Sequence, residues 1–519
     1  MSHSLQSLLK GTPHELLQGR WDVQVSSIVA DSREVEPGSL FVCLTGYRTE
    51  GGETRADRHD FIPEAVARGA AALVVERPVT VSEGVTVVRV PDVWLAHAQI
   101  ASRFYRQPSR DLVVVGVTGT SGKTSTVYFV DAVLRNAGWP TARFGTVEHR
   151  IGGEVYPARQ TTPEAHELQA LLRRAVDAGC RAVVMEVSSH ALELRRVAEV
   201  AFDVGVFTNL GRDHLNFHPD MHHYRRAKGR LFEELASGGK DGIAVINIDD
   251  AAAPYMIEVN RGRLLTYGQG DRADVRVVET RISPTDTWFS AMTPLGPCEV
   301  RLPVPGAFQV ANAVAALAVG IALGLPRDTV VAGLAAVPQV PGRFEVVNPG
   351  GEFLVIVDYA HKPDALERLL TGARSLARGR IITVFGCGGN RDRGKRPLMG
   401  EVAARLSDVV VVTSDNPRDE DPEAIISEIV AGVPREYASK LRVDVDRRRA
   451  ITSAIREAKP GDLVMIAGKG HETYQIFGGQ KLPFDDCAVA REALRARGAL
   501  QGAWRARSSS AQGAREDER

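Results

Sequence analysis

A glycine-rich loop carries the clearest chemical pattern in the chain. Residues 111–125 read Asp-Leu-Val-Val-Val-Gly-Val-Thr-Gly-Thr-Ser-Gly-Lys-Thr-Ser. A loop of this kind, placed between a strand and a helix, directs backbone N–H groups at phosphate oxygens. Lys123 would add a charge for the terminal phosphates of a nucleotide, and Thr124 a hydroxyl for Mg²⁺. The pattern therefore predicts a nucleoside triphosphate site at Gly119, Thr120, Ser121, Gly122, Lys123 and Thr124.

The loop departs from the strict P-loop spacing at one position, because Val117 stands where that pattern has glycine. A chance Gly-Lys-Thr in a surface turn is the alternative interpretation. The apolar run before the loop and the helical pattern at 127–134 after it favour phosphate binding over a chance turn.

A carboxylate, a histidine and a lysine farther along the chain would complete such a site. Glu186 ends an apolar, strand-like run, where a buried carboxylate needs a partner or a metal ion, and Mg²⁺ is a suitable one. His214 and Lys228 follow the next strand-like run. Taken alone, such a histidine is more often structural and such a lysine more often a solvated helix residue, so these alternatives stay open.

Composition limits the class of protein that positions these groups. The chain has 519 residues, 44% of them hydrophobic, which is enough for about three globular domains. Lysine plus arginine equals aspartate plus glutamate at 64 each, so no overall charge favours nucleic acid or a membrane surface. The sequence contains no apolar run long enough to span a bilayer, and its five cysteines form no Cys-x-x-Cys pair. These features indicate a soluble, cytoplasmic protein.

Strand-like and helical runs alternate along the chain, which is typical of an α/β fold. In the last third, loops rich in charge or glycine follow the strand-like runs 353–357, 381–385, 409–412 and 463–467. Parallel strands end at a common edge, so these loops predict a second ligand-binding face. We predict three domains, at residues 1–107, 108–341 and 342–500, and a disordered tail at 501–519.

Several motifs together resemble those of the Mur ligase family. They are the loop at 119–124, Glu-Val-Ser-Ser-His at 186–190, Thr-Asn-Leu at 208–210, Asp-His-Leu at 213–215, the segment at 306–312, Val-Pro-Gly-Arg-Phe-Glu at 340–345 and Asp-Tyr-Ala-His at 358–361. Their order and spacing cover nearly the whole chain. Within the family, the segments at 386–391, 415–418 and 468–472 are similar to those of members that add diaminopimelate as the third amino acid.

The resemblance implies an ATP-dependent amide ligase of peptidoglycan precursor synthesis. Its substrates would be UDP-N-acetylmuramoyl-L-alanyl-D-glutamate, meso-2,6-diaminopimelate and ATP, with Mg²⁺ as cofactor and an acyl phosphate as intermediate. The resemblance also implies an N-terminal UDP-binding domain, a central P-loop-type ATPase domain with a mainly parallel sheet, and a C-terminal Rossmann-like domain that binds the amino acid. Neither nucleic acid nor membrane insertion is expected.

The resemblance further assigns catalytic and nucleotide-binding residues. The catalytic residues are Lys123, Glu186, His214 and Lys228. The Mg²⁺ ligands are Thr124, Glu186, His214 and Lys228, the last as a carbamylated lysine whose CO₂ adduct makes an anionic ligand. In addition to the glycine-rich loop, the ATP contacts are Asn209, Asn312, Arg343 and Asp358.

The same resemblance assigns contact residues to the other two substrates. The UDP-muramoyl dipeptide is assigned Ser32, Arg33, Thr161, Thr162, Ser188 and Arg196. Diaminopimelate is assigned Arg391, Asp415, Asn416, Pro417, Arg418, Gly468 and Glu472. Tyr47 and Arg48 depart from the His-Gln pair that the family has there, which leaves the uracil contacts open.

Arg418 predicts the choice of amino acid. Diaminopimelate differs from lysine by a second carboxylate, and a planar guanidinium can meet that carboxylate with two parallel hydrogen bonds. With lysine as substrate, the Arg418 guanidinium would be left desolvated and unpaired. We therefore expect meso-diaminopimelate to be preferred to L-lysine.

Other interpretations accompany these assignments. Asp358 and Asp415 could be ordinary caps at strand ends, and the basic residues Arg391, Arg393, Lys395 and Arg396 could form a solvated loop, although their place beside glycines at a sheet edge favours an anionic ligand. Cys387 is better explained by packing than as a nucleophile. The rival functions are a folylpolyglutamate synthetase and a regulatory protein that hydrolyses ATP without ligation.

Overall fold

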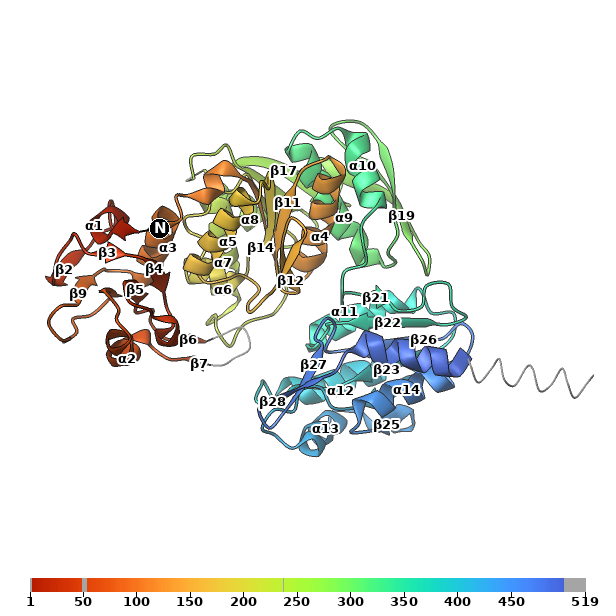
Figure 1. Cartoon of the computed structure of the whole chain (residues 1–519). Coiled ribbons are helices and arrows are strands. Elements are labelled where there is room, and N and C mark those ends of the chain that lie inside the picture. Colours follow the sequence, from red (N-terminus) through yellow and green to blue (C-terminus); the bar gives the residue numbers. More distant parts are fainter. Residues whose placement is uncertain (1, 49–53, 237, 499–519) are drawn as a thin grey trace, which may run out of the picture. The chain divides into compact units, whose positions relative to one another are not determined.

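The structure is a computed structural model that describes residues 2–48, 54–236 and 238–498 (Figure 1). The tail predicted to be disordered, 501–519, lies outside the described residues. The chain divides into two compact units: Met1–Thr280 with Phe289–Arg301 and Val310–Val337, and Arg281–Trp288 with Leu302–Gln309 and Pro338–Arg519. Among the described residues, no helix is both long and apolar enough to cross a membrane.

A five-stranded sheet forms the N-terminal part of the first unit. Its strands lie in the order β2 (Glu15–Gln18), β9 (Thr86–Arg89), β8 (Ala72–Val75), β5 (Ser39–Val42) and β4 (Ser27–Val29). Successive side chains of a strand point to opposite faces, so Leu40 and Phe41 enter two different hydrophobic cores. Helix α3 (Val93–Phe104) covers the first core and α2 (Ile62–Ala67) the second.

An eleven-stranded sheet forms the central part of the chain. Its strands lie in the order β13 (Glu154–Pro157), β12 (Glu148–Ile151), β11 (Thr141–Phe144), β14 (Ala182–Glu186), β10 (Val113–Thr118), β15 (Val204–Phe207), β16 (Ile243–Asn247), β17 (Arg263–Gly268), β18 (Val275–Ile282), β19 (Thr287–Met292) and β20 (Cys298–Leu302). Along this order in the sheet, each strand from β11 through β14, β10, β15, β16 and β17 to β18 is parallel to the next. Strand β12 is antiparallel to both of its neighbours, β11 and β13. The predicted, mainly parallel central sheet is confirmed.

Helices cover both faces of this sheet. In Figure 1, α5 (Ala165–Asp177), α7 (Met221–Glu233) and α8 (Ala253–Val259) lie on one face, and α4 (Lys123–Asn136) lies on the other. The strand register places Val117 opposite Glu186 and Thr118 opposite Phe207. The carboxyl ends of β10, β14 and β15 therefore meet at one edge of the sheet, where ligands of α/β proteins bind.

A six-stranded sheet forms the core of the second unit. Its strands lie in the order β21 (Glu345–Val346), β22 (Leu354–Asp358), β26 (Leu463–Ala467), β23 (Ile381–Phe385), β24 (Val409–Val412) and β25 (Leu441–Val443). All neighbours pair in parallel except β21, which is antiparallel to β22. Three of the four predicted strands have the observed bounds, and the fourth is shifted by one residue. This sheet confirms the predicted Rossmann-like arrangement.

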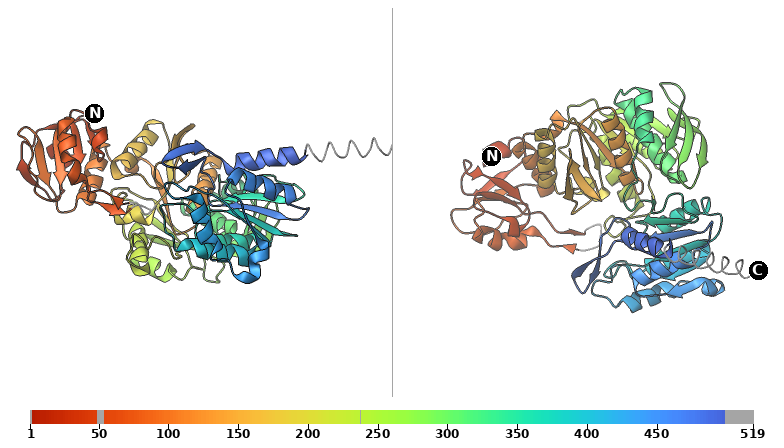
Figure 2. Two further views of the ribbon diagram at one scale, coloured as in Figure 1. Left: turned by 90° about the horizontal axis from the view of Figure 1, so that it is seen from below. Right: turned by 45° about the vertical axis from the view of Figure 1, so that its right-hand side comes forward.

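The C-terminal sheet is also covered on both faces (Figures 1 and 2). Ile356 and Phe385 enter a core under α11 (Pro363–Arg374), α12 (Lys395–Leu406) and α13 (Pro422–Val430). Val355 and Val384 point to the opposite core, under α14 (Arg447–Glu457) and a helix at 486–498. Because both faces are buried, the strands are continuous apolar runs, which is why their bounds could be read from the sequence.

Candidate active site

The glycine-rich loop connects β10 to α4 at the carboxyl edge of the central sheet. Gly119 has φ of 149°, and a Cβ there would lie 1.9 Å from Oγ1 of Thr208. Gly122 has φ of 86°, and a Cβ there would lie 2.5 Å from Oδ1 of Asn312. Both positions combine a left-handed backbone with a close neighbour, so only glycine fits them. The predicted loop conformation therefore depends on these two glycines.

The residues that follow β15 hold the loop in shape. The Ser121 backbone N–H donates to Oδ1 of Asn209 at 2.9 Å, and Nδ2 of Asn209 donates to the Ser121 carbonyl at 3.0 Å. The Thr208 hydroxyl donates to the same carbonyl at 2.7 Å. Asn209, which was assigned to the nucleotide, thus binds the backbone of the phosphate loop directly.

Two lysine ammonium groups meet at one carbonyl of this loop. Nζ of Lys123 donates to the Gly119 oxygen at 2.9 Å, and Nζ of Lys228 donates to the same oxygen at 2.9 Å. Lys228 is only 1% exposed, so it is not the solvated helix residue of the alternative interpretation. Two like charges therefore lie close together beside the loop. Thr124 is buried in the first turn of α4.

Glu186 lies at the end of β14, beside the strand that enters the loop. Its side chain is 1% exposed. Its carboxylate accepts the Thr146 backbone N–H at 2.8 Å and the Thr146 hydroxyl at 3.1 Å, and no described residue forms an ion pair with it. A buried carboxylate that only neutral donors contact is a suitable ligand for a cation.

A group of aromatic rings surrounds the predicted metal ligand His214. The ring of His214 lies 4.9 Å from that of His190 and 5.9 Å from that of Tyr224, measured between centroids. Nζ of Lys228 lies 4.6 Å from the centroid of Tyr224, so His214 and Lys228 flank the same phenol ring. Burial lowers the pKa of the neighbouring His218 to about 3, which keeps this imidazole neutral.

The described residues contain one group of three His, Cys, Asp or Glu side chains whose ligand atoms lie within 4.8 Å of one another. It consists of Asp220, His222 and His223 at the start of α7. Asp220 caps this helix by accepting the His223 backbone N–H at 2.8 Å, which explains its position without a metal ion. None of the predicted Mg²⁺ ligands belongs to this group.

Four of the residues assigned to the muramoyl dipeptide lie near Glu186. The Thr162 hydroxyl donates to the Glu186 carbonyl at 2.9 Å and accepts the Ser188 N–H at 3.1 Å, and the Thr161 hydroxyl oxygen lies 3.2 Å from the Thr146 hydroxyl oxygen. The buried Arg196 donates to the Thr162 carbonyl at 3.2 Å. The structure thus brings together the residues that the sequence placed in separate segments.

Arg196 also contacts the N-terminal sheet region. Its Nη2 donates to the Tyr47 hydroxyl at 2.9 Å and lies 3.0 Å from Oε1 of Glu164. Its Nη1 donates to Oε1 of Gln160 at 2.6 Å. Tyr47 was left without an assignment in the sequence, because it departs from the family's histidine. In the structure, it connects the N-terminal part of the chain to Arg196.

Ser32 and Arg33 lie apart from these contacts, in a single 3₁₀ turn of the N-terminal region. The Ser32 hydroxyl donates to Glu64 at 2.6 Å. The exposed Arg33 donates to both carboxylate oxygens of Asp31, and this pairing lowers the pKa of Asp31 to about 2. Both residues therefore have protein partners in the structure.

Arg343 and Asp358, assigned to ATP, belong to the second unit. Asp358 ends β22 and accepts the N–H groups of Phe344 and Ala360, each at 2.8 Å. It therefore does act as a strand-end cap, and burial raises its pKa. Arg343 lies 4.6 Å over the ring of Tyr359, and its buried Nε has no hydrogen-bond partner among the described residues. A buried, unpartnered guanidinium nitrogen favours an anionic ligand there.

The residues assigned to diaminopimelate gather at the carboxyl ends of β24 and β26. Nδ2 of Asn416 donates to Oε2 of Glu472 at 2.8 Å. Nζ of Lys469 donates to Asn416 Oδ1 and to Glu472 Oε2, both at 3.1 Å, and lies 3.8 Å from Asp415 Oδ1. Gly468 has φ of 114°, and a Cβ there would lie 2.8 Å from Asp415 Oδ2. Lys469, which is 0% exposed, thus holds together three of the assigned residues.

Arg418 is fixed by the loop that follows β23. Its Nη1 donates to the Gly389 carbonyl at 2.8 Å, and its backbone N–H donates to the Ile476 carbonyl at 2.9 Å. A Cβ at Gly389 would lie 1.8 Å from the Pro417 carbonyl, so the two loops touch closely. Arg391 and Arg418 both act to lower the pKa of Tyr474, which burial raises overall. Both guanidinium groups therefore lie within electrostatic reach of the same tyrosine.

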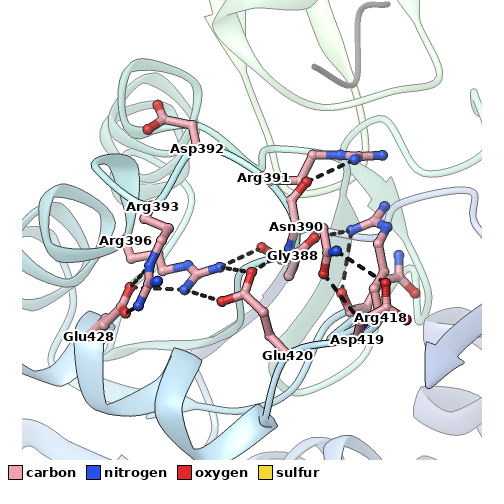
Figure 3. Close-up of polar contacts among 12 residues, drawn as sticks. Gly388, Asn390, Arg391, Asp392, Arg393, Arg396, Arg418, Asp419, Glu420 and Glu428 are labelled. Carbon is pink, nitrogen blue, oxygen red and sulfur yellow. Dashed lines mark hydrogen bonds and ion pairs between the residues drawn. The ribbon is translucent and has the colours of Figure 1, made fainter. Parts of the chain in front are cut away.

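The remaining basic residues of the loop at 391–396 differ from the expectation. Arg393 and Arg396 pair with Glu428, and Arg396 also pairs with Glu420 (Figure 3). The interpretation of these two arginines as ligands of an anion is wrong, because protein carboxylates already neutralise them. Lys395 donates to the His361 carbonyl at 2.8 Å.

Cys387 has the packing role that was favoured for it. It is buried, and its Sγ lies 3.6 Å from Sδ of Met399. Burial raises the pKa of this thiol to about 12, so the nucleophilic thiolate is suppressed.

Comparison with known families identifies the chain. The family model described as "Mur ligase middle domain" matches residues 117–320, "Mur ligase, glutamate ligase domain" matches 342–470, and "Mur ligase family, catalytic domain" matches 24–105. The chain belongs to the Mur ligase family. A relative from Geobacillus kaustophilus, named UDP-N-acetylmuramoyl-L-alanyl-D-glutamate--2,6-diaminopimelate ligase, is 44% identical over 95% of this chain and 100% of its own length.

Solved structures resemble this Mur ligase over most of its length. A structure of a UDP-N-acetylmuramoyl-L-alanyl-D-glutamate--2,6-diaminopimelate ligase matches with a TM-score of 0.68 and 33% identity, covering 96% of this chain and all of the other. A folylpolyglutamate synthase from Mycobacterium tuberculosis, complexed with ADP and AMPPCP, matches with a TM-score of 0.59 and 21% identity over 72% of this chain and 92% of its own. The latter similarity shows a shared fold alone.

Three residues of the site were missed in the sequence. Thr146, Tyr47 and Lys469 each contact an assigned residue, but they lie in loops or short strands without periodicity. Lys469 is inside the motif at 468–472, where its charge was a usable signal. The partners of Thr146 and Tyr47 are 40 and 149 residues away, so no local pattern indicates them.

We predict that a Lys469→Met variant is less stable than the unaltered protein. The substitution leaves Glu472 and Asp415 without their buried cation, which should lower the free energy of unfolding by about 2–3 kcal/mol. The midpoint of urea unfolding, followed by circular dichroism, measures this. The exposed Lys459 serves as control, and Lys459→Met should change the midpoint little. Equal midpoints for both variants would contradict the role of Lys469.

Proposed function

We propose that this Mur ligase is an ATP-dependent, ADP-forming ligase that joins meso-2,6-diaminopimelate to UDP-N-acetylmuramoyl-L-alanyl-D-glutamate in peptidoglycan precursor synthesis. The observation that carries the proposal is the 44% identity to a ligase of that name over 95% of this chain. We further propose a cytoplasmic location. All five cysteines are free, which supports a reducing compartment. The domain boundaries after residues 107 and 341 remain a prediction.

The proposed reaction activates a carboxylate before the amide forms. A carboxylate oxygen of the D-glutamyl residue attacks the γ-phosphorus of ATP, the bond to the bridging oxygen breaks, and ADP leaves. The amine of diaminopimelate then attacks the acyl phosphate, and the phosphate leaves with the bonding electron pair while the amine loses a proton. Because ATP and the UDP-muramoyl dipeptide are anions, the enzyme contributes mainly positioning and compensating charge.

Residues of the first unit supply that charge in the proposal. Lys123 already donates to the Gly119 carbonyl, and phosphate oxygens offer its ammonium group better acceptors. Asn209 holds the Ser121 backbone, and Asn312 lies against Gly122. We assign the loop, Asn209 and Asn312 to the phosphates.

Residues of the second unit are assigned to the nucleotide as well. Arg343 has an unpartnered, buried Nε suited to an anion. Each carboxylate oxygen of Asp358 accepts one backbone N–H. Its remaining lone pairs can accept hydrogen bonds from ribose hydroxyls.

The donor set of the central site fits Mg²⁺. Glu186 is a buried carboxylate without an ion-pair partner among the described residues, and Thr124 adds a hydroxyl oxygen. We propose that Thr124, Glu186, His214 and Lys228 hold Mg²⁺. When bound, Mg²⁺ supplies positive charge that reduces the repulsion between the phosphates and the attacking carboxylate.

An ammonium group would repel Mg²⁺, so Lys228 needs a modification to serve as a ligand. Its amine can add to CO₂ and release a proton, which gives an anionic carbamate. The carbamate also removes the repulsion between two ammonium groups at the Gly119 carbonyl. The burial of Lys228 protects such an adduct from water. We propose that Lys228 is carbamylated in the active enzyme.

The muramoyl dipeptide is assigned to the group around Arg196. Thr161, Thr162, Ser188 and Arg196 lie at the carboxyl edge beside Glu186, where the activated carboxylate must be. Tyr47 and Glu164 hold the Arg196 guanidinium in place. We keep the assignment of Ser32 and Arg33 to the uridine diphosphate end of this substrate. On binding it, Ser32 would give up its hydrogen bond to Glu64, and Arg33 its pairing with Asp31.

Diaminopimelate is assigned to the loops at the edge of the six-stranded sheet. Arg391 and Arg418 offer two guanidinium groups for its carboxylates, and Glu472 offers a carboxylate for the distal amine. Asn416 and Pro417 shape the loop, and Gly468 leaves the space that Asp415 occupies.

The two rival functions are distinguished by product formation: a folylpolyglutamate synthetase would glutamylate a folate, and a regulatory protein would release ADP without either acceptor.

We expect a Lys123→Ala variant to remain folded and to form no product. The substitution removes the ammonium group that the γ-phosphate needs in the transition state, which should lower kcat by about 10³-fold or more. A coupled ADP-release assay with all three substrates measures this, and circular dichroism verifies the fold. Near-normal turnover in a folded variant would contradict the ATP site.

A Lys228→Ala variant should also be nearly inactive, but for a different reason. It lacks the carbamate anion, so added formate or acetate should restore part of the activity by supplying a carboxylate. Lys123→Ala is the matched control, because it lacks a cation and no carboxylate should rescue it. An unmodified amine at Lys228 in the mass of the active enzyme would contradict the carbamate.

The substrate proposal predicts a strong preference among amino acids. The unaltered enzyme should use meso-diaminopimelate on the order of 10³-fold better than L-lysine in kcat/KM, because lysine leaves a guanidinium unpaired. Arg418→Ala should lose most of this preference while the KM for ATP changes little. Arg435→Ala, which removes an exposed arginine of the same unit, is the control. Comparable specificity constants for the two amino acids would refute the assignment.

A further inference from the structure

Arg396 is a fully buried arginine that lies between two loops of the amino-acid site (Figure 3). Its Nη1 donates to Glu420 Oε2 and to Glu428 Oε2, both at 2.9 Å. Its Nη2 donates to Glu420 Oε1 at 2.9 Å and to the Gly388 carbonyl at 3.3 Å. The guanidinium therefore holds the Glu420 carboxylate with two parallel hydrogen bonds, which fixes its orientation as well as its distance.

Glu420 extends this contact to the second loop. Its Oε1 accepts the backbone N–H of Asn390, which precedes Arg391. Glu420 itself follows Arg418 by two residues. The Arg396–Glu420 pair thus binds the loop of Arg391 from one side and the loop of Arg418 from the other. The hydrogen bonds from Arg396 hold the pKa of Glu420 below its usual value, so this carboxylate stays charged at neutral pH.

The two loops are joined by several further hydrogen bonds. The Gly389 N–H donates to the Asn416 carbonyl at 2.9 Å, and Nη1 of Arg418 donates to the Gly389 carbonyl at 2.8 Å. Nδ2 of Asn390 donates to Asp419 Oδ2 at 3.1 Å. Each of these bonds holds only if the spacing between the loops is kept. That spacing also sets the distance between the Arg391 and Arg418 guanidinium groups.

The backbone of both loops has an uncommon conformation at one residue each. Asn390 and Arg418 have φ of 53° and 54°, a left-handed conformation that non-glycine residues seldom adopt. Such residues persist where their surroundings constrain them, and they are frequent at ligand sites. Here Arg396 and Glu420 provide a buried, charged part of those surroundings.

We propose that Arg396 is a positioning residue that, through Glu420, sets the spacing of Arg391 and Arg418 and thereby the affinity and selectivity for an amino acid with two carboxylates. This inference rests on the proposed function, because it takes Arg391 and Arg418 as the carboxylate contacts. Arg396 is fully buried and protein oxygens accept from both of its terminal nitrogens, which leaves only its buried Nε without a hydrogen-bond partner among the described residues. It therefore acts through the loops.

The test compares Arg396→Lys, Arg396→Met and Glu420→Gln with the unaltered full-length enzyme. Lysine keeps the charge but loses the two parallel bonds, and glutamine keeps the shape but loses the charge. In each variant the KM for meso-diaminopimelate should rise by about 10-fold to 100-fold. The preference over L-lysine should fall, while the KM values for ATP and the UDP-muramoyl dipeptide stay within about twofold.

Arg393→Met is the matched control. Arg393 lies in the same loop as Arg396 and pairs with Glu428. It is exposed, and the structure describes no hydrogen bond from its side chain to Glu420 or Gly388. This variant should keep the KM for diaminopimelate. Thermal unfolding identifies folded variants, and if Arg396→Met does not fold, Arg396→Lys and Glu420→Gln decide the question.

The outcomes separate this inference from the proposed function. An unaltered enzyme that does not ligate diaminopimelate would overturn the proposed function, and the positioning role with it. An active enzyme whose folded variants keep the KM for diaminopimelate would overturn the positioning role alone. An equal rise in KM for all three substrates would likewise show that Arg396 only stabilises the fold.

Discussion

The arrangement of every described site depends on one geometric constraint, which is that parallel strands end at the same edge of their sheet. In the central sheet, this brings the ends of β10, β14 and β15 together, so the phosphate loop, Glu186 and Asn209 become neighbours although about ninety residues separate the first from the last. In the C-terminal sheet, the same constraint places the loops after β23, β24 and β26 side by side. Each sheet thereby supplies a face on which charged side chains from distant segments meet.

Buried charge is the second feature that both faces share. Lys228 and Glu186 are almost wholly buried beside the phosphate loop, and Lys469 and Arg396 are wholly buried beneath the amino-acid loops. Burying an ion is costly unless a partner of opposite sign or a bound ligand compensates it. For Lys469 and Arg396, the partners are protein carboxylates, so these two residues organise their loops. For Glu186, the described residues offer a backbone N–H and a hydroxyl without an ion pair, which suits a cationic ligand.

The arginines of the amino-acid loops differ in the protein contacts that the structure describes. Arg391, Arg393, Arg396 and Arg418 lie within two neighbouring loops and look alike in the sequence. Arg393 and Arg396 pair with Glu428 or Glu420, whereas the side chains of Arg391 and Arg418 donate to backbone carbonyls. Residue type alone therefore does not separate a ligand contact from a structural contact in this region.

The sequence by itself determined the fold class, four strands of the C-terminal sheet and the glycine-rich loop, because each of these depends on local periodicity and on backbone requirements at single residues such as Gly119 and Gly122. It also predicts site residues through motifs that end strands, and the structure places several of these residues close together. Only the tertiary structure decided which charges are neutralised. The contacts of Tyr47 with Arg196, of Thr146 with Glu186 and of Arg396 with Glu420 join segments whose separation in the chain has no fixed period. Such contacts depend on how loops pack at a sheet edge, and that packing is settled when the whole sheet has formed.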